Sequence, residues 1–390
     1  MLRAYKYRLW TNSNQDRELG IMLETHRRLY NSCLDQRKTT YETEKRSIKY
    51  AEQSAWYKEQ RQTNSFFARL NFSSAQATMR RLDKAFTAFF RRLKTGMKPG
   101  YPRFKGADRF SSIEFPTHGD GIRLTGNRLR IQHVGIIKVC LHRSLPDDDA
   151  QIRTLTVTRE CNHWYLEVCF KLPDQQPASS SLPAVGLDVG IEHFLTTSDG
   201  EHIPNPGYLK SALPELHRTQ RSLSRKKKGG KNRAKAKIKV RKLHAKVKNL
   251  RNEHRHKTSL NLIRRYGCIA VEDLNVKGML GNRRLSRAIS DVAWSAFITT
   301  LIHKAESAGA TVVQVPPQGT SQECSCCGQT VPKKLSERWH NCPHCGLSLQ
   351  RDVNAARNIL MRAFTSPGSG EWDVTVLKQG AVSQEAVCFS

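Results

Sequence analysis

A chain of 390 residues is long enough for two or three domains. It carries 65 Lys or Arg against 34 Asp or Glu, which gives a formal net charge of +31. Such an excess predicts a polyanionic partner, because cations that contact phosphates release condensed counterions and so drive association. A membrane partner is disfavoured, since the sequence has neither a long apolar stretch nor a lipidation motif.

The N-terminal segment and the cysteines indicate the compartment. Tyr5, Tyr7 and Leu9 alternate with basic residues, which predicts a β-strand rather than the apolar core of a signal peptide. Of the 11 cysteines, four fall into two C-x-x-C pairs and the others are scattered. We therefore expect a reduced, cytoplasmic protein with one metal site instead of a disulfide framework.

Two helices are predicted before residue 100. Apolar residues recur at helical spacing over 13–34, after a possible cap at Ser13, and over 73–94. The basic stretch 98–106 follows, in which two prolines and two glycines exclude regular structure. Its side chains suited to stacking on bases and holding phosphates are Tyr101, Arg103, Phe104 and Lys105. The alternative is an ordinary basic turn whose rings pack under a neighbouring domain.

Residues 110–172 have the pattern of a small β-domain. Short runs of alternating polar and apolar residues are separated by turn residues, which favours a β-barrel. The N-terminal strand is expected to join this barrel, so that the two helices form an insertion. Residues 173–183 have the composition of a linker.

From residue 184 onward the pattern becomes that of an α/β domain. Two strands are predicted within 184–200, and they end at an Asp199-Gly200 hairpin turn. A third strand is predicted within 267–273, and a helix, capped by Ser290, over 290–308. A strand at 311–315 and a helix that begins near Asp352 complete the domain. Residues 366–390 show little periodicity and are expected to form a loose tail.

One segment of this second half is exceptionally basic. Between Arg221 and Lys257 the sequence holds 17 Lys or Arg and a single Glu. Apolar residues recur at 3-4-3 spacing from Val240 to Leu250, which predicts a helix with a narrow apolar seam. So much uncompensated charge repels itself, and we therefore expect it to lie along a polyanion. The cations assigned to this contact are Arg241, Lys242, Lys246 and Lys248.

The two C-x-x-C pairs predict a zinc site. Each pair is followed by a glycine, and 14 residues separate them, which is typical of a structural zinc site. Four thiolates close a tetrahedral site with no position open for water. The predicted ligands are Cys324, Cys327, Cys342 and Cys345. Cys326, His340 and His344 are competing ligands, although four cysteines need no further partner.

Asp188, Glu272 and Asp352 are candidate catalytic acids, because catalytic acids of an α/β sheet lie at strand ends and helix starts. Asp188 interrupts a predicted apolar strand, Glu272 ends another, and Asp352 opens a predicted helix. Carboxylates of this kind hold Mg²⁺, which prefers hard oxygen ligands. A pair of such ions clamps the attacking water and the leaving oxygen of a phosphodiester. Each acid alone also has an ordinary alternative, as a turn residue or a helix cap.

Several segments together resemble the TnpB family, which is encoded by bacterial and archaeal insertion sequences and is related to type V CRISPR effectors. These segments are GLDVG around Asp188, VEDLNVKGM from Val271, TSQECSCCG from Thr320, CPHCG from Cys342 and RDVNAARNIL from Arg351. The opening AYKYRL and the GYPRFK stretch also resemble that family, so the match spans roughly residues 1–363. Two departures are Gln350, where an acid is frequent, and the extra Cys326.

The resemblance implies a fold with two interrupted domains. One is a ribonuclease-H-like RuvC nuclease domain at 182–319 and 349–365, into which a zinc ribbon at 320–348 is inserted. The other is a β-barrel wedge domain at 1–12 and 107–175, into which a helical recognition domain at 13–106 is inserted. Asp188, Glu272 and Asp352 match the family's three catalytic acids and would hold Mg²⁺.

The resemblance also implies an RNA-guided DNA endonuclease. Such a protein, a monomer with its RNA, would hold a guide from the transposon end and read a short motif beside double-stranded target DNA. It would cut by two-metal-ion hydrolysis. Two other functions stay open, namely a guided repressor that binds without cutting and a transposase that needs no RNA. Retention of all three acids argues against the repressor.

Overall fold

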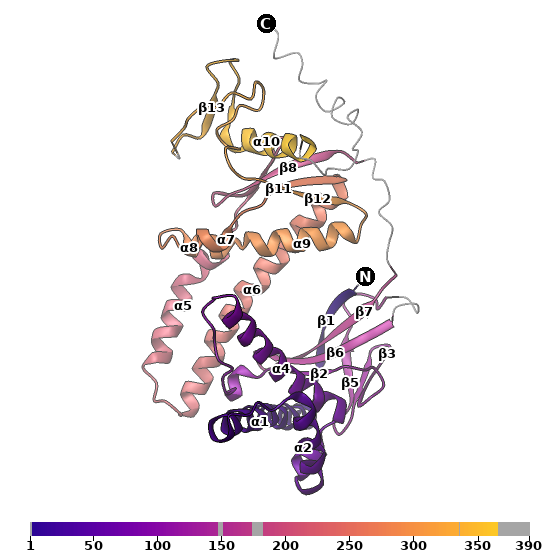
Figure 1. Ribbon diagram of the computed structural model, residues 1–390. Helices are drawn as coiled ribbons and strands as arrows, with labels where there is room; N and C mark the ends of the chain where they lie inside the picture. The colour runs from indigo at the N-terminus through magenta and orange to yellow at the C-terminus, as the bar shows by residue number, and fades with distance from the viewer. Residues whose placement is uncertain (1, 147–150, 174–181, 335, 366–390) are drawn as a thin grey trace. The chain divides into compact units, whose positions relative to one another are not determined.

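The computed structural model describes residues 2–146, 151–173, 182–334 and 336–365 (Figure 1). The chain divides into two compact units, Met1–Asp174 and Gln175–Ser390. The tail expected at 366–390 and most of the expected linker lie outside the described residues. None of the described helices is long and apolar enough to cross a membrane.

A seven-stranded antiparallel sheet forms the centre of the first unit. Its strands are β1 (Leu2–Trp10), β2 (Ser112–Phe115), β3 (Ile122–Thr125), β4 (Arg128–Ile131), β5 (Gly135–Cys140), β6 (Gln151–Glu160) and β7 (His163–Lys171). The order β2-β6-β7-β1-β5-β4-β3 places the N-terminal strand in the middle, which confirms that β1 joins the β-domain. The sheet is open rather than a closed barrel, since its short edge strands, β2 and β3, do not pair with each other in the described part of the chain.

The helices of the first unit lie between β1 and β2 in sequence. They are α1 (Ser13–Glu44), α2 (Tyr50–Thr63), α3 (Ser65–Ala68), α4 (Phe72–Lys94) and the 3₁₀ turn η1 (Ala107–Arg109). Asn12, not Ser13, caps α1, because its side chain and that of Gln15 form a reciprocal capping box. Helix α1 extends ten residues past the predicted end. The sequence did not indicate this extension, because residues 35–44 are mostly polar and continue no apolar stripe.

The second unit is built on a mixed five-stranded sheet. Its strands are β8 (Ala184–Val189), β9 (His193–Thr197), β10 (His202–Pro204), β11 (Cys268–Glu272) and β12 (Thr311–Val315), in the order β10-β9-β8-β11-β12. Strands β8, β11 and β12 are parallel, and β9 and β10 are antiparallel to their neighbours. The helices are α5 (Tyr208–Ser224), α6 (Lys231–Arg265), α7 (Val276–Met279), α8 (Ser286–Val292), α9 (Trp294–Glu306) and α10 (Arg351–Thr365).

Two helices cover opposite faces of this sheet, α9 on one and α10 on the other (Figure 1). Alternate residues of β8 therefore have different neighbours. Val185, Leu187 and Val189 join the buried cluster that includes Phe297 and Leu301 of α9. The residues between them face α10, whose own small core contains Ala270, Ile359 and Ala363.

The helix predicted over 290–308 is interrupted, and its predicted cap is wrong. Ser290 lies inside α8, and Ala293 separates α8 from α9 in a left-handed conformation, with φ 58°. The backbone N–H of Ala293 bonds to the carbonyl of Ile289, which closes the first helix. A left-handed residue that ends a helix is usually Gly or Asn and rarely Ala, so the sequence around Ala293 gives no signal for the break.

Helices α5 and α6 form a hairpin that projects from the sheet (Figure 1). The predicted apolar seam is narrow, since Val247 is its one fully buried member, and Val240, Leu243 and Leu250 are half-buried. Arg251 anchors the base of the hairpin through an ion pair of 2.5 Å to Asp291, which also accepts the backbone N–H of Leu209.

Strand β8 and helix α10 approach so closely that only glycine fits between them. A Cβ atom added to Gly186 would lie 1.9 Å from the carbonyl oxygen of Ala356. Gly186→Ala should therefore displace α10 and destabilise the second unit by about 1–3 kcal/mol or more, the range for overpacked cores. Thermal unfolding followed by circular dichroism measures this change.

Gly20→Ala is the matched control. Gly20 lies inside α1, and a Cβ added there meets nothing within 4 Å. This substitution should leave stability unchanged or raise it by up to about 1 kcal/mol, the difference in helix propensity. A Gly186→Ala protein that unfolds at the wild-type temperature would contradict the assigned helix–strand packing.

Candidate functional site

The sheet places Asp188 and Glu272 next to each other. Strands β8 and β11 are parallel and pair Leu187 with Val271, so the next residue of each strand is one of the two acids. Asp188 is two residues from Gly186 and Glu272 is two residues from Ala270, both of which face α10. Because side chains alternate along a strand, both acids lie on the α10 face.

Helix α10 brings the third acid to the same place. Asp352 precedes Ala356 by four residues, which puts both on one face of the helix. Ala356 is the residue in contact with Gly186, and Asp188 follows Gly186 on the same face of β8. The close approach at Gly186 is therefore what allows Asp352 to lie near Asp188.

The three acids repel one another. Burial raises the pKa of Asp188 well above its usual range, the charges of Glu272 and Asp352 raise it further, and Arg351 opposes them. Arg351 also holds Asp352 through an ion pair of 3.2 Å, in which both side chains are largely buried. A buried surplus of negative charge and oxygen donors fits a divalent cation such as Mg²⁺.

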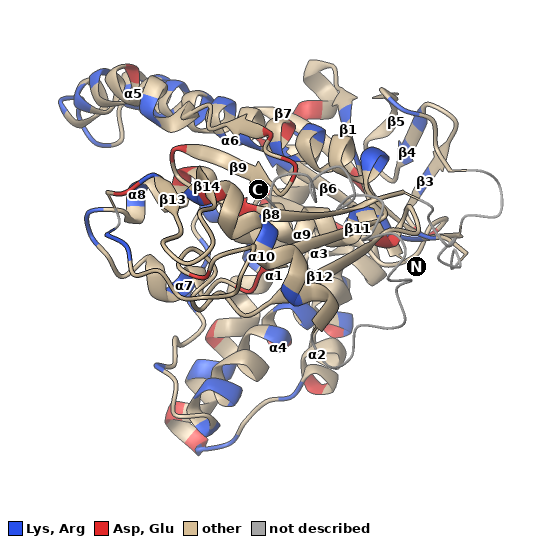
Figure 2. Cartoon of the chain, turned by 90° about the horizontal axis from the view of Figure 1, so that it is seen from above, with Lys and Arg blue, Asp and Glu red and all other residues tan. Residues whose placement is uncertain are grey.

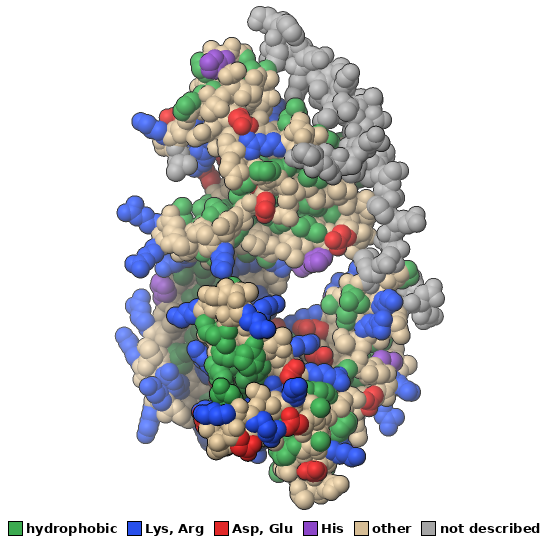
Figure 3. All heavy atoms as spheres, in the orientation of Figure 1, with side chains coloured by type: hydrophobic (Ala, Val, Ile, Leu, Met, Phe, Trp, Pro, Cys, Tyr) green, Lys and Arg blue, Asp and Glu red, His purple; other side chains and the backbone are tan. Residues whose placement is uncertain are grey.

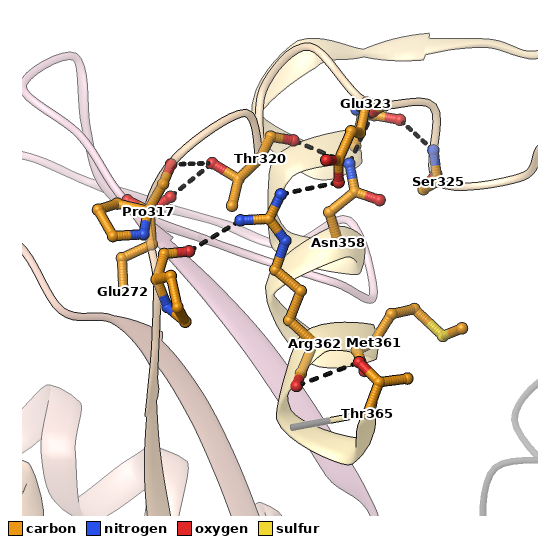
Figure 4. A network of polar contacts seen from close by, with 11 residues as sticks. Glu272, Pro317, Thr320, Glu323, Ser325, Asn358, Met361, Arg362 and Thr365 are labelled. Atoms are coloured by element: carbon orange, nitrogen blue, oxygen red, sulfur yellow. Dashed lines mark hydrogen bonds and ion pairs between the residues drawn. The ribbon is translucent and has the colours of Figure 1, made fainter. Parts of the chain in front are cut away.

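Glu272 has a hydrogen-bonding partner that the sequence did not reveal. Its side chain is 8% exposed, and its Oε1 accepts a bond of 2.6 Å from the Thr320 hydroxyl (Figure 4). Burial raises the pKa of Glu272, whereas this bond and the nearby Arg362 lower it. Thr320 begins the TSQECSCCG segment, but nothing in that pattern indicated a contact across 48 residues.

The four predicted cysteines form a compact cluster. Their sulfur atoms all lie within 4.8 Å of one another, and those of Cys324–Cys345 and Cys327–Cys342 are 3.6 Å apart. Four thiolates around one zinc ion have sulfur separations of about 3.8 Å, whereas a disulfide measures about 2.0 Å. The spacing therefore fits a tetrahedral zinc ion and excludes a disulfide.

Two similar turns build this cluster. In each C-x-x-C-G turn, the glycine N–H bonds to the carbonyl of the first cysteine, at 2.9 Å for Gly328 and 3.0 Å for Gly346. Both glycines have positive φ, 72° and 75°. Glycine adopts this conformation without steric cost, so each turn can bring both thiols to one side. The short strands β13 (Trp339–Asn341) and β14 (Ser348–Gln350) flank the second turn.

The competing ligands stay outside the cluster. Within the described part of the chain, the four cysteines are the one group of three or more His, Cys, Asp or Glu residues placed to hold a metal ion. Cys326 and His344 are exposed, and His340 is buried beside Lys333. The three candidate carboxylates do not gather as tightly as the thiols.

The basic stretch 98–106 is largely at the surface. Tyr101, Arg103 and Phe104 are exposed, and Tyr101 stands edge-on against two phenylalanines of α4, Phe86 and Phe89. Figure 3 shows the hydrophobic side chains gathered over this part of α4, with Lys and Arg at their edge.

Lys105 differs from its neighbours in this stretch. Its backbone N–H bonds to the side chain of Asn31, and its carbonyl accepts from Arg27. Lys105 therefore anchors the loop through its backbone, while its side-chain nitrogen lies 5.7 Å from the centre of the Tyr30 ring.

The α5–α6 hairpin carries a dense array of cations (Figure 2). Lys242, Lys246 and Lys248 are exposed on α6, and Arg241 is partly buried. At the other end of the hairpin, near the turn, a hollow is lined by Pro214, Arg218, Arg221, Ser222, Arg225 and Lys226. This hollow contains four cations and no acid, so its chemistry suits a phosphate backbone.

Three family models match parts of the chain. They are described as "Probable transposase" (residues 167–283), "Cas12f1-like, TNB domain" (residues 294–359) and "Helix-turn-helix domain" (residues 1–46). The last description does not fit this structure, because the described residues there form strand β1 and the single helix α1.

Two solved structures share the fold. One is Cas12f1 with a single-guide RNA and target DNA, which is 15% identical, has a TM-score of 0.56, and covers 87% of this chain and 81% of its own. The other is the mini RNA-guided endonuclease CRISPR-Cas_phi3, which is 10% identical, has a TM-score of 0.54, and covers 95% and 94%.

Curated relatives extend over nearly the whole chain. A protein of Streptomyces pristinaespiralis, named as an RNA-guided DNA endonuclease, is 32% identical over 374 residues, 95% of this chain and 91% of its own length. InsQ of Escherichia coli K12, which has the same designation, is 27% identical and covers 95% and 94%. Similarity of this extent, with the transposase model and the cysteine cluster, shows that the chain belongs to the TnpB family of transposon-encoded proteins.

Proposed function

We propose that this protein is an RNA-guided DNA endonuclease whose cleavage centre consists of Asp188, Glu272 and Asp352. The observation that carries the proposal is that three acids, far apart in sequence, lie where helix α10 packs on the sheet, two of them on strands and the third on the helix. The names of the full-length relatives support the same activity.

The proposed domains follow the two interrupted folds. Residues 182–319 and 349–365 would form a ribonuclease-H-like RuvC nuclease, and residues 320–348 a zinc ribbon. Residues 1–12 and 107–175 would form the wedge domain, and residues 13–106 the recognition domain. The mixed sheet of the second unit and the seven-stranded sheet of the first support this division.

The residues of the centre have distinct roles. Asp188, whose pKa is raised by burial and by the charges of Glu272 and Asp352, would hold Mg²⁺ together with these two acids. Arg351 holds Asp352 in place, and Thr320 holds Glu272. Bound Mg²⁺ would stabilise negative charge that develops on the phosphodiester oxygens.

The nucleic acids would bind outside this centre. A guide RNA from the transposon end would contact the α5–α6 hairpin and the 98–106 stretch, and base pairing with it would select the double-stranded DNA target. Both surfaces are rich in exposed cations, and the second adds exposed rings suited to stacking. We propose that the active particle is a monomer with its RNA.

A repressor that binds without cutting is the second candidate. It would use the same cationic surfaces but would not need acids whose charges repel one another inside the protein. Such an arrangement costs stability, which favours the nuclease.

Removing any one acid should abolish cleavage. Asp188→Ala, Glu272→Ala and Asp352→Ala should each reduce guided cleavage by at least about 100-fold, the scale on which one electrostatic stabiliser acts. Target binding should change little, because it depends on pairing and on cationic surfaces. The three effects should not add, since each substitution disables the same centre. Cleavage of a matched target and filter binding measure the two properties.

Asp273→Asn is the control for these variants. Asp273 follows Glu272 directly but is exposed, so it should be dispensable for cutting. Asp199 is less suitable, because it accepts a hydrogen bond of 2.7 Å from Tyr266. Near wild-type cleavage by Asp188→Ala would refute the assigned centre.

Loss of one thiol should release the zinc. Cys342→Ser and Cys345→Ser should each lower zinc content from one equivalent toward zero and reduce thermal stability, because a structural site contributes folding energy. Cys326→Ser should retain its zinc, since this thiol lies outside the cluster. Elemental analysis measures the zinc content of each variant. Full zinc content in Cys342→Ser and Cys345→Ser would exclude the four-cysteine zinc site.

Neutralising the hairpin should weaken RNA binding. Replacement of Arg241, Lys242, Lys246 and Lys248 by Gln should lower the slope of log affinity against log salt by about 0.7–0.9 for each phosphate that the helix no longer binds. Changing the three lysines to Arg instead keeps the charge and should preserve the slope. Identical slopes for all proteins would show that this face does not bind RNA.

A further inference from the structure

One short segment connects the cysteine cluster with the acids. Residues 320–325, here called the entry segment, follow strand β12 after residues 316–319 and contain Cys324, the first cysteine of the cluster. Thr320 at its start is 4% exposed and bonds to Glu272, while Cys324 near its end is 2% exposed. The entry segment therefore touches both centres.

Two asparagines of α10 hold the entry segment. Asn354 donates from its side-chain nitrogen to the carbonyl of Glu323 at 2.7 Å and accepts from the backbone N–H of Ser325 at 2.9 Å. Asn358 donates to the carbonyls of Glu323 and Thr320 at 2.7 and 2.8 Å (Figure 4).

The amide N–H₂ group of Asn358 and the carbonyl of Glu323 are fully engaged. Both amide hydrogens of Asn358 are engaged, and the Glu323 carbonyl accepts one bond from each asparagine. Asn354 and Asn358 are 0% and 6% exposed. Inside a protein a satisfied network fixes its members, because breaking one bond leaves a buried group unpaired. The backbone of Thr320 is thus fixed to the helix that carries Asp352.

The Thr320 hydroxyl has one hydrogen and two acceptors within reach. The Glu272 carboxylate is 2.6 Å away and the Pro317 carbonyl is 3.2 Å away. The shorter bond to a charged group is the stronger one. It engages Oε1 of Glu272 and leaves the second carboxylate oxygen for a cation. Arg362 of α10 also connects this helix to the same region, since it donates hydrogen bonds to the Pro316 carbonyl and to the Glu323 carboxylate.

We propose that Thr320 is a positioning residue, which orients the Glu272 carboxylate for the metal and couples it to the zinc ribbon through the entry segment. This inference rests on the proposed function, because it assigns Glu272 to the metal. Thr320 itself would bind neither metal nor nucleic acid. Its role is to restrict one carboxylate to a single orientation.

The test compares Thr320→Val with Thr320→Ser. Valine has nearly the shape of threonine but cannot donate, whereas serine keeps the hydroxyl. Mn²⁺ binding to the purified protein, followed by electron paramagnetic resonance, should weaken about tenfold or more in Thr320→Val, the scale of a hydrogen bond to a charged group. Thr320→Ser should remain close to wild type. Zinc content should be one equivalent in both.

A double substitution separates positioning from general damage. In a Glu272→Gln background, Thr320→Val should cause no further weakening of Mn²⁺ binding, because the two residues act as one unit. Additive effects would overturn the proposal, as would wild-type Mn²⁺ affinity in Thr320→Val. If Thr320→Val loses its zinc or fails to fold, Thr320→Cys replaces it, since a thiol is a weak donor. Its affinity should lie between those of the serine variant and Glu272→Gln, and wild-type affinity would again overturn the proposal.

The outcomes also distinguish this inference from the proposed function. A wild-type protein that neither binds Mn²⁺ nor cuts a matched target would refute the nuclease. A wild-type protein that does both, with a Thr320→Val variant that matches it, would refute only the positioning role.

Discussion

The close packing of Gly186 against Ala356 is the constraint on which the second unit depends. At Gly186, helix α10 lies so close to the sheet that no side chain larger than a hydrogen atom fits between them. That distance brings Asp352 toward Asp188, and it lets Asn354 and Asn358 reach the entry segment. The packing of one strand against one helix therefore organises the acids and the approach to the zinc ribbon together.

Electrostatics explains why the site is built with so much support. The charges of Glu272 and Asp352 raise the pKa of the buried Asp188, because like charges repel, and this repulsion opposes folding. Arg351 and Arg362 offset part of this repulsion, and Thr320 does so through a hydrogen bond. The basic hairpin presents the opposite case, since its cations repel one another along a helix with a narrow seam. The acid cluster therefore requires a cationic partner, and the basic hairpin requires an anionic one.

The sequence predicted the elements that periodicity or spacing defines. Strand β12 and the four cysteines of the cluster were predicted residue by residue, because alternation and C-x-x-C spacing are local signals. The break at Ala293 and the hydrogen bond of Thr320 to Glu272 were not, because one depends on an unusual conformation and the other on tertiary packing. Family resemblance assigned the three acids, whereas their spacing alone left each with an ordinary alternative.

The central position of β1 has a consequence for synthesis. Its partners β5 and β7 lie much later in the chain, at residues 135–140 and 163–171. The first sheet therefore cannot be completed until residue 171 has left the ribosome. The third acid, on α10, comes later still. A chain whose translation stops between α6 and α10 has the basic α5–α6 hairpin but lacks Asp352, so such an incomplete copy carries an unfinished acid cluster.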